Sequence, residues 1–250
     1  MAVAIVPARL GSERFPGKLL AAETGRPLVQ HAVEAAGRAR GVERVVVAAE
    51  DEAFVDALAP FGTEVVLTGA HPNGTSRIAE AAVLLGLGGD EIVVNVQGDE
   101  PEVEAGVVEA ALGALEGVGV GAWEGVGMST VGSPFVAGED ASDPNIVKVV
   151  RGIDGRALYF SRALVPFDRD GSGGVAPLKH VGLYCYRVWM LERYVGLEPT
   201  PLERCEKLEQ LRVLEHGLPI AVAVAEAAHH GIDTAAQYGA FVERWRSSGA

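Results

Sequence analysis

Cysteines and basic residues are both scarce in this sequence. It has two cysteines, Cys185 and Cys205, and their positions match neither a metal-binding motif nor a disulfide framework. Such usage is typical of proteins in a reducing compartment, so we expect a cytoplasmic protein. Lysine and arginine number 21 against 34 aspartates and glutamates, and the net charge is -13. Because non-specific binding to nucleic acid needs clustered positive charge, we expect no nucleic-acid partner.

Long hydrophobic runs are also missing. No apolar stretch approaches the ~20 residues that a membrane-spanning helix requires, so we expect no membrane partner. The first residues, MAVAIVPARLG, start apolar but lack the basic segment of a signal peptide, which favours a first strand. There is no internal repeat and no low-complexity linker. A length of 250 residues is within reach of one α/β domain, so we expect a single domain over residues 1–250.

Short apolar runs alternate with helical patterns in the first half of the chain. Runs typical of strands buried on both faces occupy residues 2–6, 45–49, 64–67 and 92–96. Amphipathic or helix-favouring segments occupy residues 27–40, 52–60, 77–85 and 101–115. This alternation predicts an α/β fold with a mostly parallel sheet covered by helices.

The second half mixes strands, turns and helices. A hairpin turning at Asp154-Gly155 is expected within residues 145–160, and further strands at residues 179–187 and 219–224. A helix is expected to begin after Thr200 and to run to residue 216. Capping is predicted by Thr75 or Ser76 for the helix at residues 77–85 and by Asp233 for the last helix. The glycine-rich residues 117–131 predict no definite geometry, and residues 132–143 a loop.

The stretch IVVNVQGDEP carries the first functional signal. Its buried strand ends in Gln97, Gly98 and Asp99, and ligands of parallel sheets bind beyond the carboxyl ends of the strands. A carboxylate there is well placed for a metal ion, and the glycine allows the backbone to approach a ligand closely. A polar turn that caps the following helix is the alternative.

The loop at residues 7–18 gathers three of the 21 basic residues: Arg9, Arg14 and Lys18. Glycines that turn backbone N–H groups outward, together with these cations, favour phosphate binding. The loop follows neither the Walker A pattern nor G-x-G-x-x-G. A solvated basic loop is the alternative, although it would not explain why the cations gather here.

Two further patterns point to ligands. Arg77 lies in the first turn of a predicted helix, where a cation opposes the helix dipole, so an anionic or base-edge partner is expected. The alternative is an arginine that extends to solvent. In the strand KHVGLYCYR, His180, Tyr184 and Tyr186 share one face, which suggests a ligand surface or a subunit contact.

Seven stretches in this order resemble the 3-deoxy-manno-octulosonate (Kdo) cytidylyltransferases, also called CMP-Kdo synthetases. They are IVPARLGSERFPGKLL, NGTSRIAE, VVNVQGDEP, DPNIVKVV, ALYFSRALVPFDRD, KHVGLYCYR and LERCEKLEQLRVLEHG. The resemblance implies a Rossmann-like sheet of the nucleotide-diphospho-sugar transferase type, with a smaller mixed lobe within about residues 145–190 that forms a homodimer. It also implies a transferase that uses CTP, Kdo and Mg2+ in lipopolysaccharide synthesis.

The resemblance also assigns roles to single residues. The residues expected to hold CTP are Ala8, Arg9, Ser12, Lys18 and Arg77, with Arg9, Lys18 and Asp99 as the catalytic set. Those expected to contact Kdo are Gln97, Arg162, His180, Tyr184, Glu209 and Gln210. Asp99 and Asp233 would bind Mg2+. For Glu209 and Gln210, a charged outer helix face is the alternative.

The chain departs from the family pattern at three places. Ser76 stands where the family usually has an acidic residue, and Ala48-Ala49-Glu50 replaces Ala-Thr-Asp. After Asp233-Thr234 the sequence continues Ala-Ala-Gln rather than Pro-Glu-Asp. A cytidylyltransferase for another acidic sugar, of the sialic or pseudaminic type, and a catalytically inactive nucleotide-binding homologue remain as alternatives. A glycosyltransferase is disfavoured because the D-x-D metal motif is missing at Gly98-Asp99-Glu100.

Overall fold

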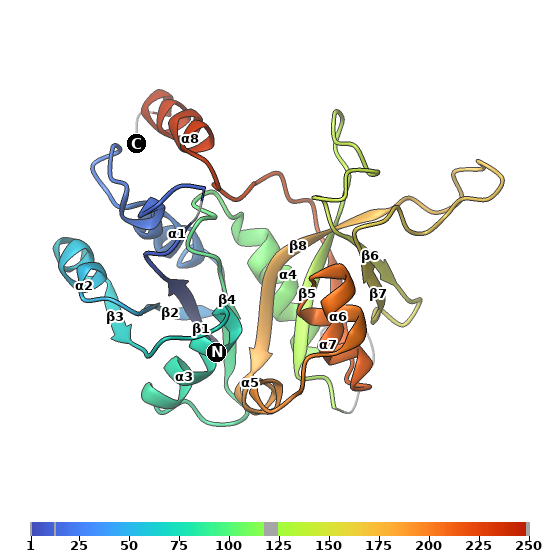
Figure 1. The fold of residues 1–250 in the computed structure, drawn as a ribbon, viewed down its shortest axis with the longest axis horizontal. Coiled ribbons are helices and arrows are strands. Elements are labelled where there is room, and N and C mark those ends of the chain that lie inside the picture. The colour runs from blue at the N-terminus through green and yellow to red at the C-terminus, as the bar shows by residue number, and fades with distance from the viewer. Residues whose placement is uncertain (1, 13, 118–124, 249–250) are drawn as a thin grey trace. The chain divides into compact units, whose positions relative to one another are not determined.

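The computed structural model describes residues 2–12, 14–117 and 125–248 (Figure 1). The chain divides into two compact units. The first comprises Met1–Ala105 and His229–Ala250, and the second comprises Gly106–Ala228. The expectation of one domain with a dimerisation lobe at residues 145–190 stays a prediction. No helix among the described residues is long and apolar enough to span a membrane.

The first unit contains a parallel sheet. Its strands follow the order β3 (Glu64–Leu67), β2 (Val42–Ala49), β1 (Ala2–Ala8) and β4 (Ile92–Asn95). All three pairings are parallel, and β1 pairs with both β2 and β4. The apolar runs predicted as strands are therefore strands, and β4 is buried along its whole length.

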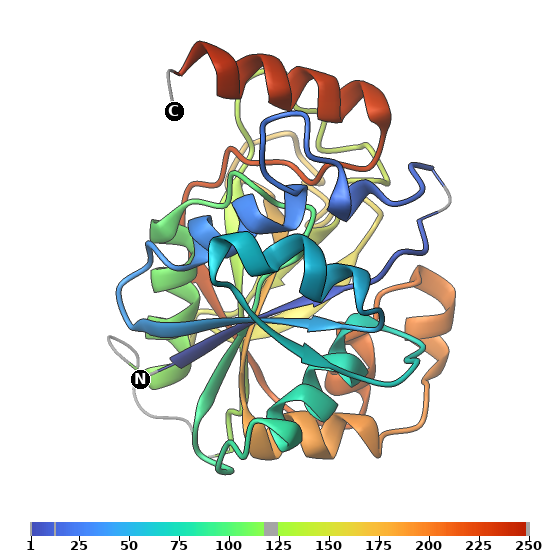
Figure 2. The same cartoon turned by 90° about the vertical axis from the view of Figure 1, so that its left-hand side faces the viewer.

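Helices cover this sheet on both sides. They are α1 (Leu28–Ala36), α2 (Ala53–Leu58), α3 (Gly74–Leu84), α8 (Ala235–Ser247) and the short 3₁₀ turns η1 (Lys18–Leu20) and η2 (Ala59–Phe61). The ribbon views show α1 and α3 on opposite sides of the strands (Figure 2). The last helix, α8, packs on α1, where the ring of His31 lies 5.0 Å from Phe241 and 4.4 Å from Trp245.

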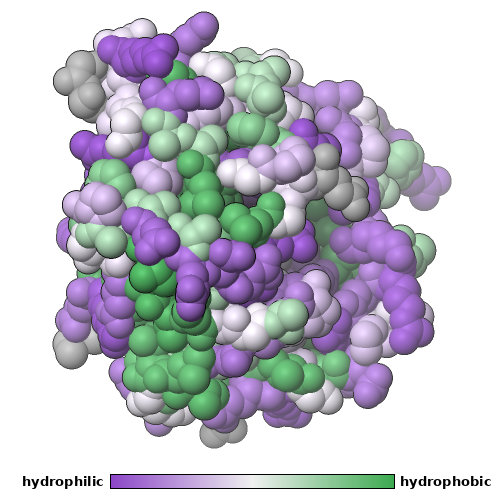
Figure 3. Space-filling model, turned by 60° about the vertical axis from the view of Figure 1, so that its left-hand side comes forward, coloured by the Kyte–Doolittle hydropathy of each residue, from purple (hydrophilic) through white to green (hydrophobic). Residues whose placement is uncertain are grey.

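Some apolar surface of the first unit stays exposed. The large hydrophobic side chains concerned are Val55, Phe61, Leu67, Val83 and Leu84. They come from α2, η2, the edge strand β3 and the end of α3. Figure 3 shows hydrophobic side chains gathered into a patch among polar ones on the face in view.

The second unit is built on a mixed sheet. Its strands are β5 (Met128–Pro134), β6 (Lys148–Arg151), β7 (Ala157–Ser161), β8 (Leu178–Arg187) and β9 (Ile220–Val224). Strand β5 lies between β8, to which it is antiparallel, and β9, to which it is parallel. The predicted hairpin is confirmed as the antiparallel pair β6 and β7. Its helices are α4 (Ala105–Glu116), α5 (Val188–Val195), α6 (Pro201–Glu206) and α7 (Gln210–Glu215).

Several sequence expectations are wrong in detail. Strand β5 runs from residues for which no definite geometry was expected into residues expected to be a loop. The expectation for residues 118–124 lies outside the described residues. The helix expected to run to residue 216 is two helices, because Lys207 adopts a left-handed conformation with φ 55° and ends α6. The predicted N-caps of α3 and α8 are also wrong. Asn73 caps α3 by accepting from the Ser76 N–H, and Thr234 caps α8 by accepting from the Gln237 N–H.

The buried His31 makes the stability of the first unit depend on pH. Burial lowers the pKa of His31 from 6.5 to about 4, whereas the ring titrates near its ordinary value in the unfolded chain. Between these two values the unfolded chain binds the extra proton, so stability falls as the pH is lowered through this window.

We predict that His31→Gln reduces this pH dependence, because glutamine is polar but does not titrate. Urea unfolding at pH 7 and pH 5 measures the difference in free energy of unfolding for each protein. The wild type should lose more stability than the variant between the two pH values. Parallel losses would contradict the assignment to His31.

Candidate active site

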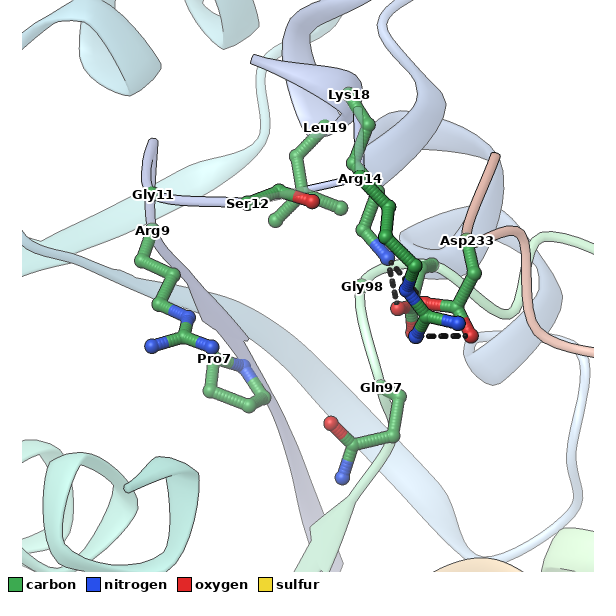
Figure 4. Close-up of a pocket in the computed structure, with 11 residues that line it drawn as sticks. Pro7, Arg9, Gly11, Ser12, Arg14, Lys18, Leu19, Gln97, Gly98 and Asp233 are labelled. Carbon is green, nitrogen blue, oxygen red and sulfur yellow. Dashed lines mark hydrogen bonds and ion pairs between the residues drawn. The ribbon is translucent and has the colours of Figure 1, made fainter. Parts of the chain in front are cut away.

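A polar cavity of about 700 Å³ lies in the first unit, where three segments distant in sequence come together. The loop after β1, the turn after β4 and the segment before α8 form its walls. The lining residues are Pro7, Arg9, Gly11, Ser12, Arg14, Lys18, Leu19, Gln97, Gly98, Asp99 and Asp233 (Figure 4). Because β1 and β4 are parallel neighbours, their carboxyl ends meet at the same edge of the sheet, as the sequence predicted.

Two glycines allow these segments to approach one another. Gly17 adopts φ 70°, a left-handed conformation that favours glycine, and it directs the chain into η1, which carries Lys18. A Cβ at Gly98 would lie 3.3 Å from both the side chain of Leu19 and the carbonyl oxygen of Pro7. A side chain at residue 98 would require Leu19 or the Pro7 backbone to shift by a few tenths of an ångström, so glycine favours this close packing.

The ammonium group of Lys18 lies between two carboxylates. Its Nζ is 2.5 Å from Asp99 Oδ2 and 3.0 Å from Asp233 Oδ1, and it also donates to the Ile232 carbonyl at 2.8 Å. The Lys18 side chain is 11% exposed, so this contact is largely shielded from water. Arg14 adds a second cation, 2.9 Å from Asp233 Oδ2. Figure 4 shows Arg9 projecting from a separate part of the wall.

These two carboxylates fit a magnesium ion better than they fit a transition metal. No cluster of three or more His, Cys, Asp or Glu side chains that would hold a metal occurs within the described residues. Mg2+ binds through one or two carboxylates, and its remaining ligands are waters and substrate phosphates. Asp99 and Asp233 supply such a pair of hard oxygen donors, and the Lys18 ammonium between them demonstrates that positive charge is favoured at this place. Asp233 is available for this role because Thr234 caps α8 instead.

A buried cluster next to the two aspartates includes His229, to which the sequence analysis gave no role. The His229 side chain is 3% exposed and contacts Glu104 through Nδ1 and Glu100 through Nε2. Burial, with smaller contributions from the charges of Asp99 and Glu104, raises the pKa of Glu100 to about 8. The local sequence gives no signal that the His229 side chain is buried and His230 is exposed, because this difference arises only from how the folded chain packs.

Arg77 has the anionic partner that its position predicted, and the partner belongs to the protein. Its guanidinium is buried and donates to Glu50 Oε2 at 2.6 Å and to Thr68 Oγ1 at 2.7 Å. The alternative of an arginine extended to solvent is wrong. Glu50 also accepts from the Leu10 N–H at 3.3 Å, so the Arg77–Glu50 pair supports the loop after β1. Arg77 and Ala8 are not among the residues lining the cavity, and their role at the nucleotide stays a prediction.

The residues expected to bind the sugar belong to both units. Gln97 lines the cavity of the first unit, and the others lie in the second. In the second unit, the ring of His180 lies 5.3 Å from Tyr184, so the predicted shared face is confirmed. Burial lowers the pKa of His180 to about 3, so its imidazole is neutral at pH 7. It is therefore suited to hydrogen bonding rather than to pairing with an anion as a cation.

The other predicted sugar contacts are held by neighbouring groups. Glu209 accepts from the Tyr194 hydroxyl at 3.2 Å, and burial raises the pKa of Glu209. Arg162 donates to the carbonyl oxygens of Glu206 and Pro144, at 2.7 and 3.0 Å. Gln210 is buried at the start of α7. The alternative of an exposed outer helix face is therefore wrong for Gln210, while the sugar contacts themselves stay predictions.

Comparison with known proteins gives consistent results. The family model described as cytidylyltransferase matches residues 3–220. The 3-deoxy-manno-octulosonate cytidylyltransferase of Syntrophobacter fumaroxidans is 46% identical over 234 residues, which cover 93% of this chain and 92% of that protein. The enzyme of the same name from Anaeromyxobacter sp. strain K is 48% identical over 232 residues, covering 92% and 91% of the two chains.

Solved structures extend the likeness to the fold. A CMP:2-keto-3-deoxy-manno-octonic acid synthetase complexed with CTP matches with a TM-score of 0.89 and 35% identity, covering 99% of both chains. A 4-diphosphocytidyl-2C-methyl-D-erythritol synthase matches with a TM-score of 0.63 and 12% identity over 97% of this chain and 96% of its own. This second likeness concerns the fold alone. The expected α/β fold, with its sheet covered by helices, is confirmed.

We predict that Arg77→Met destabilises the protein by about 1–3 kcal/mol, because it leaves Glu50 and Thr68 without their buried donor. Arg44→Met is the matched control. It removes the partner of Glu64 in an exposed ion pair and should cost no more than about 1 kcal/mol. Urea unfolding of both variants measures the costs. Equal costs would contradict the structural role given to Arg77.

Proposed function

Because this chain belongs to the family of 3-deoxy-manno-octulosonate cytidylyltransferases, we propose that it transfers CMP from CTP to the anomeric hydroxyl of Kdo. The products are CMP-Kdo and pyrophosphate, and the pathway is lipopolysaccharide synthesis in the cytoplasm. The convergence of Lys18, Asp99 and Asp233 in one cavity carries this proposal. The presence of Lys18, Asp99 and Asp233 together argues against a module that only binds a nucleotide.

The reaction is an in-line attack of the Kdo 2-hydroxyl on the α-phosphorus of CTP. The bond from oxygen to this phosphorus forms as the bond to the departing pyrophosphate breaks. Negative charge develops on the phosphates, and positioned cations stabilise it. Arg9, Arg14 and Lys18 line the cavity and supply this charge. No covalent intermediate on the protein is required.

The carboxylates of Asp99 and Asp233 would hold Mg2+. When bound, this ion neutralises phosphate charge and polarises the attacking hydroxyl. The Lys18 ammonium, which pairs with these carboxylates in the structure, would serve the phosphate oxygens of bound CTP. Gln97 lines the same cavity, and its amide would orient a substrate hydroxyl.

The acidic sugar requires its own binding groups, since Kdo is a carboxylate that must approach a polyphosphate. We assign the positive charge of this subsite to Arg162. His180, neutral at pH 7, and Tyr184 would supply aromatic and hydrogen-bonding contacts, while Glu209 and Gln210 would contact sugar hydroxyls. Another acidic sugar of the sialic or pseudaminic type would use the same chemistry, so a choice among acidic sugars is part of the test.

A homodimer is proposed for the second unit. Five large apolar side chains of this unit are strongly exposed within residues 145–190: Ile153, Leu158, Leu164, Phe167 and Val175. So many exposed apolar side chains within one stretch of the sequence favour a protein–protein interface. A second copy of the chain is the proposed partner.

The first prediction concerns the reaction itself. Purified protein with Mg2+, CTP and Kdo should release pyrophosphate, and UTP, ATP or sialic acid in place of the matching substrate should give far less. Release with a different acidic sugar would keep the mechanism and change the substrate. Binding of CTP without release in any combination would support the catalytically inactive alternative.

The second prediction concerns the metal carboxylates. Asp99→Asn should lower kcat at least about a hundredfold while leaving the circular dichroism spectrum unchanged, because it removes one charge of the pair that holds Mg2+. Asp56→Asn, an exposed change on α2, is the control and should retain full activity. Near-normal turnover of Asp99→Asn would remove this residue from the metal site.

The third prediction concerns assembly. The wild-type protein should sediment as a dimer, at twice the chain mass of 26.1 kDa. The Phe167→Asp variant should sediment closer to the mass of a single chain. Phe167 is 82% exposed, so the change should not disturb folding. Val83→Asp, in the exposed apolar surface of the first unit, is the control and should stay dimeric. A wild-type monomer at micromolar concentration would overturn the proposed dimer.

A further inference from the structure

The segment at residues 229–233 delivers Asp233 to the active site and is attached to the turn after β4 at two points. At one end, the Ile232 N–H donates to the carbonyl oxygen of Asp99 at 2.8 Å. At the other end, the His229 N–H donates to Glu104 Oε1 at 3.1 Å. The side chain of His229 contacts the second oxygen of the same carboxylate through Nδ1.

The other ring nitrogen of His229 faces a second carboxylate. Its Nε2 lies 3.8 Å from Glu100 Oε2, an oxygen that is buried and has no hydrogen-bond partner among the described residues. The imidazole therefore occupies the space between two glutamates of the turn that also carries Asp99. The imidazole itself is 3% exposed and is shielded from water, while Glu104 is 39% exposed.

We propose that His229 is a positioning residue, which fixes the segment at residues 229–233 on the turn after β4 so that Asp233 stands opposite Asp99. This inference rests on the proposed function, because it gives the two aspartates a common cation. It assigns His229 no contact with substrate and no part in proton transfer.

Contacts that hold Asp233 opposite Asp99 are needed because of the position of Lys18. Asp99 and Asp233 are 134 positions apart, and like charges held close together repel each other. In the structure the Lys18 ammonium bridges them, but the reaction requires Lys18 at the phosphates. Contacts that do not involve Lys18 must then maintain the spacing of the two carboxylates. The Ile232–Asp99 backbone bond and the His229–Glu104 contact are of this kind.

A histidine buried only for packing would give a different outcome. Loss of packing would lower stability without changing the affinity for the metal in the protein that remains folded. Loss of positioning would weaken the metal complex specifically, because Mg2+ requires strict geometry from its ligands. The two roles are therefore distinguished by measuring metal affinity and stability on the same variants.

The test compares His229→Leu with His230→Leu, the adjacent exposed histidine. His229→Asn is the conservative variant, since its amide nitrogen takes the place of Nδ1 and can still donate to Glu104. Binding of Mn2+ in the presence of CTP is measured by water-proton relaxation. Turnover is measured as a function of Mg2+ at saturating CTP and Kdo, and thermal unfolding gives the stability of each protein.

We expect His229→Leu to weaken Mn2+ binding about tenfold, equivalent to ~1.4 kcal/mol. The Mg2+ concentration for half-maximal turnover should rise to the same extent, while the KM for Kdo changes less than twofold. His229→Asn should recover most of the affinity, and His230→Leu should match the wild type. Unchanged Mn2+ binding in folded His229→Leu, or equal effects of the two leucine variants, would overturn the proposal.

Two further arms keep the test decisive. If His229→Leu does not fold, Glu104→Gln replaces it, because this half-exposed side chain can lose its charge without leaving a cavity; unchanged Mn2+ binding in that variant would also overturn the proposal. If the wild type binds Mn2+ with CTP but releases no pyrophosphate, the proposed function fails. The relaxation measurement would then still decide the role of His229.

Discussion

The site depends on the attraction between one ammonium group and two carboxylates. Lys18 follows the first strand, Asp99 follows the fourth, and Asp233 precedes the last helix, so no local interaction brings them together. The parallel pairing of β1 with β4 brings the segments of Lys18 and Asp99 to the same edge of the sheet. The packing of α8 on α1 brings Asp233 to that edge as well. The order of strands in the first unit therefore determines the chemistry of the cavity.

The positions of the strands were predictable because burial on both faces leaves a simple apolar signal. The residues that cap or end the helices were harder to predict. Thr234 and Asp233 are adjacent and both are good caps, and only tertiary contacts decide that the threonine caps α8 while the aspartate reaches Lys18. The left-handed Lys207, which separates α6 from α7, has no sequence signal at all, since this conformation is rare for lysine.

The candidate site was predictable to a similar extent. The cations around Lys18 and the carboxylate of Asp99 were found from local sequence, because a basic loop and a strand-terminal acid are each recognisable alone. Asp233 was found only through family resemblance, and His229 was not found. Its role depends on a glutamate 125 residues away, and single-sequence patterns carry no information about such contacts.

The Arg77–Glu50 pair has a consequence for how this chain differs from its relatives. Glu50 stands where the resemblance to the family suggests an aspartate, and a glutamate has one more methylene of reach than an aspartate. That reach lets a single side chain bind a buried guanidinium and the backbone of the loop after β1 together. Glu50 thus connects Arg77 of helix α3 to the Leu10 N–H of the loop. A shorter aspartate at this position would keep only one of these two hydrogen bonds. The departure from the family pattern is therefore a change in how the loop after β1 is supported by the rest of the first unit.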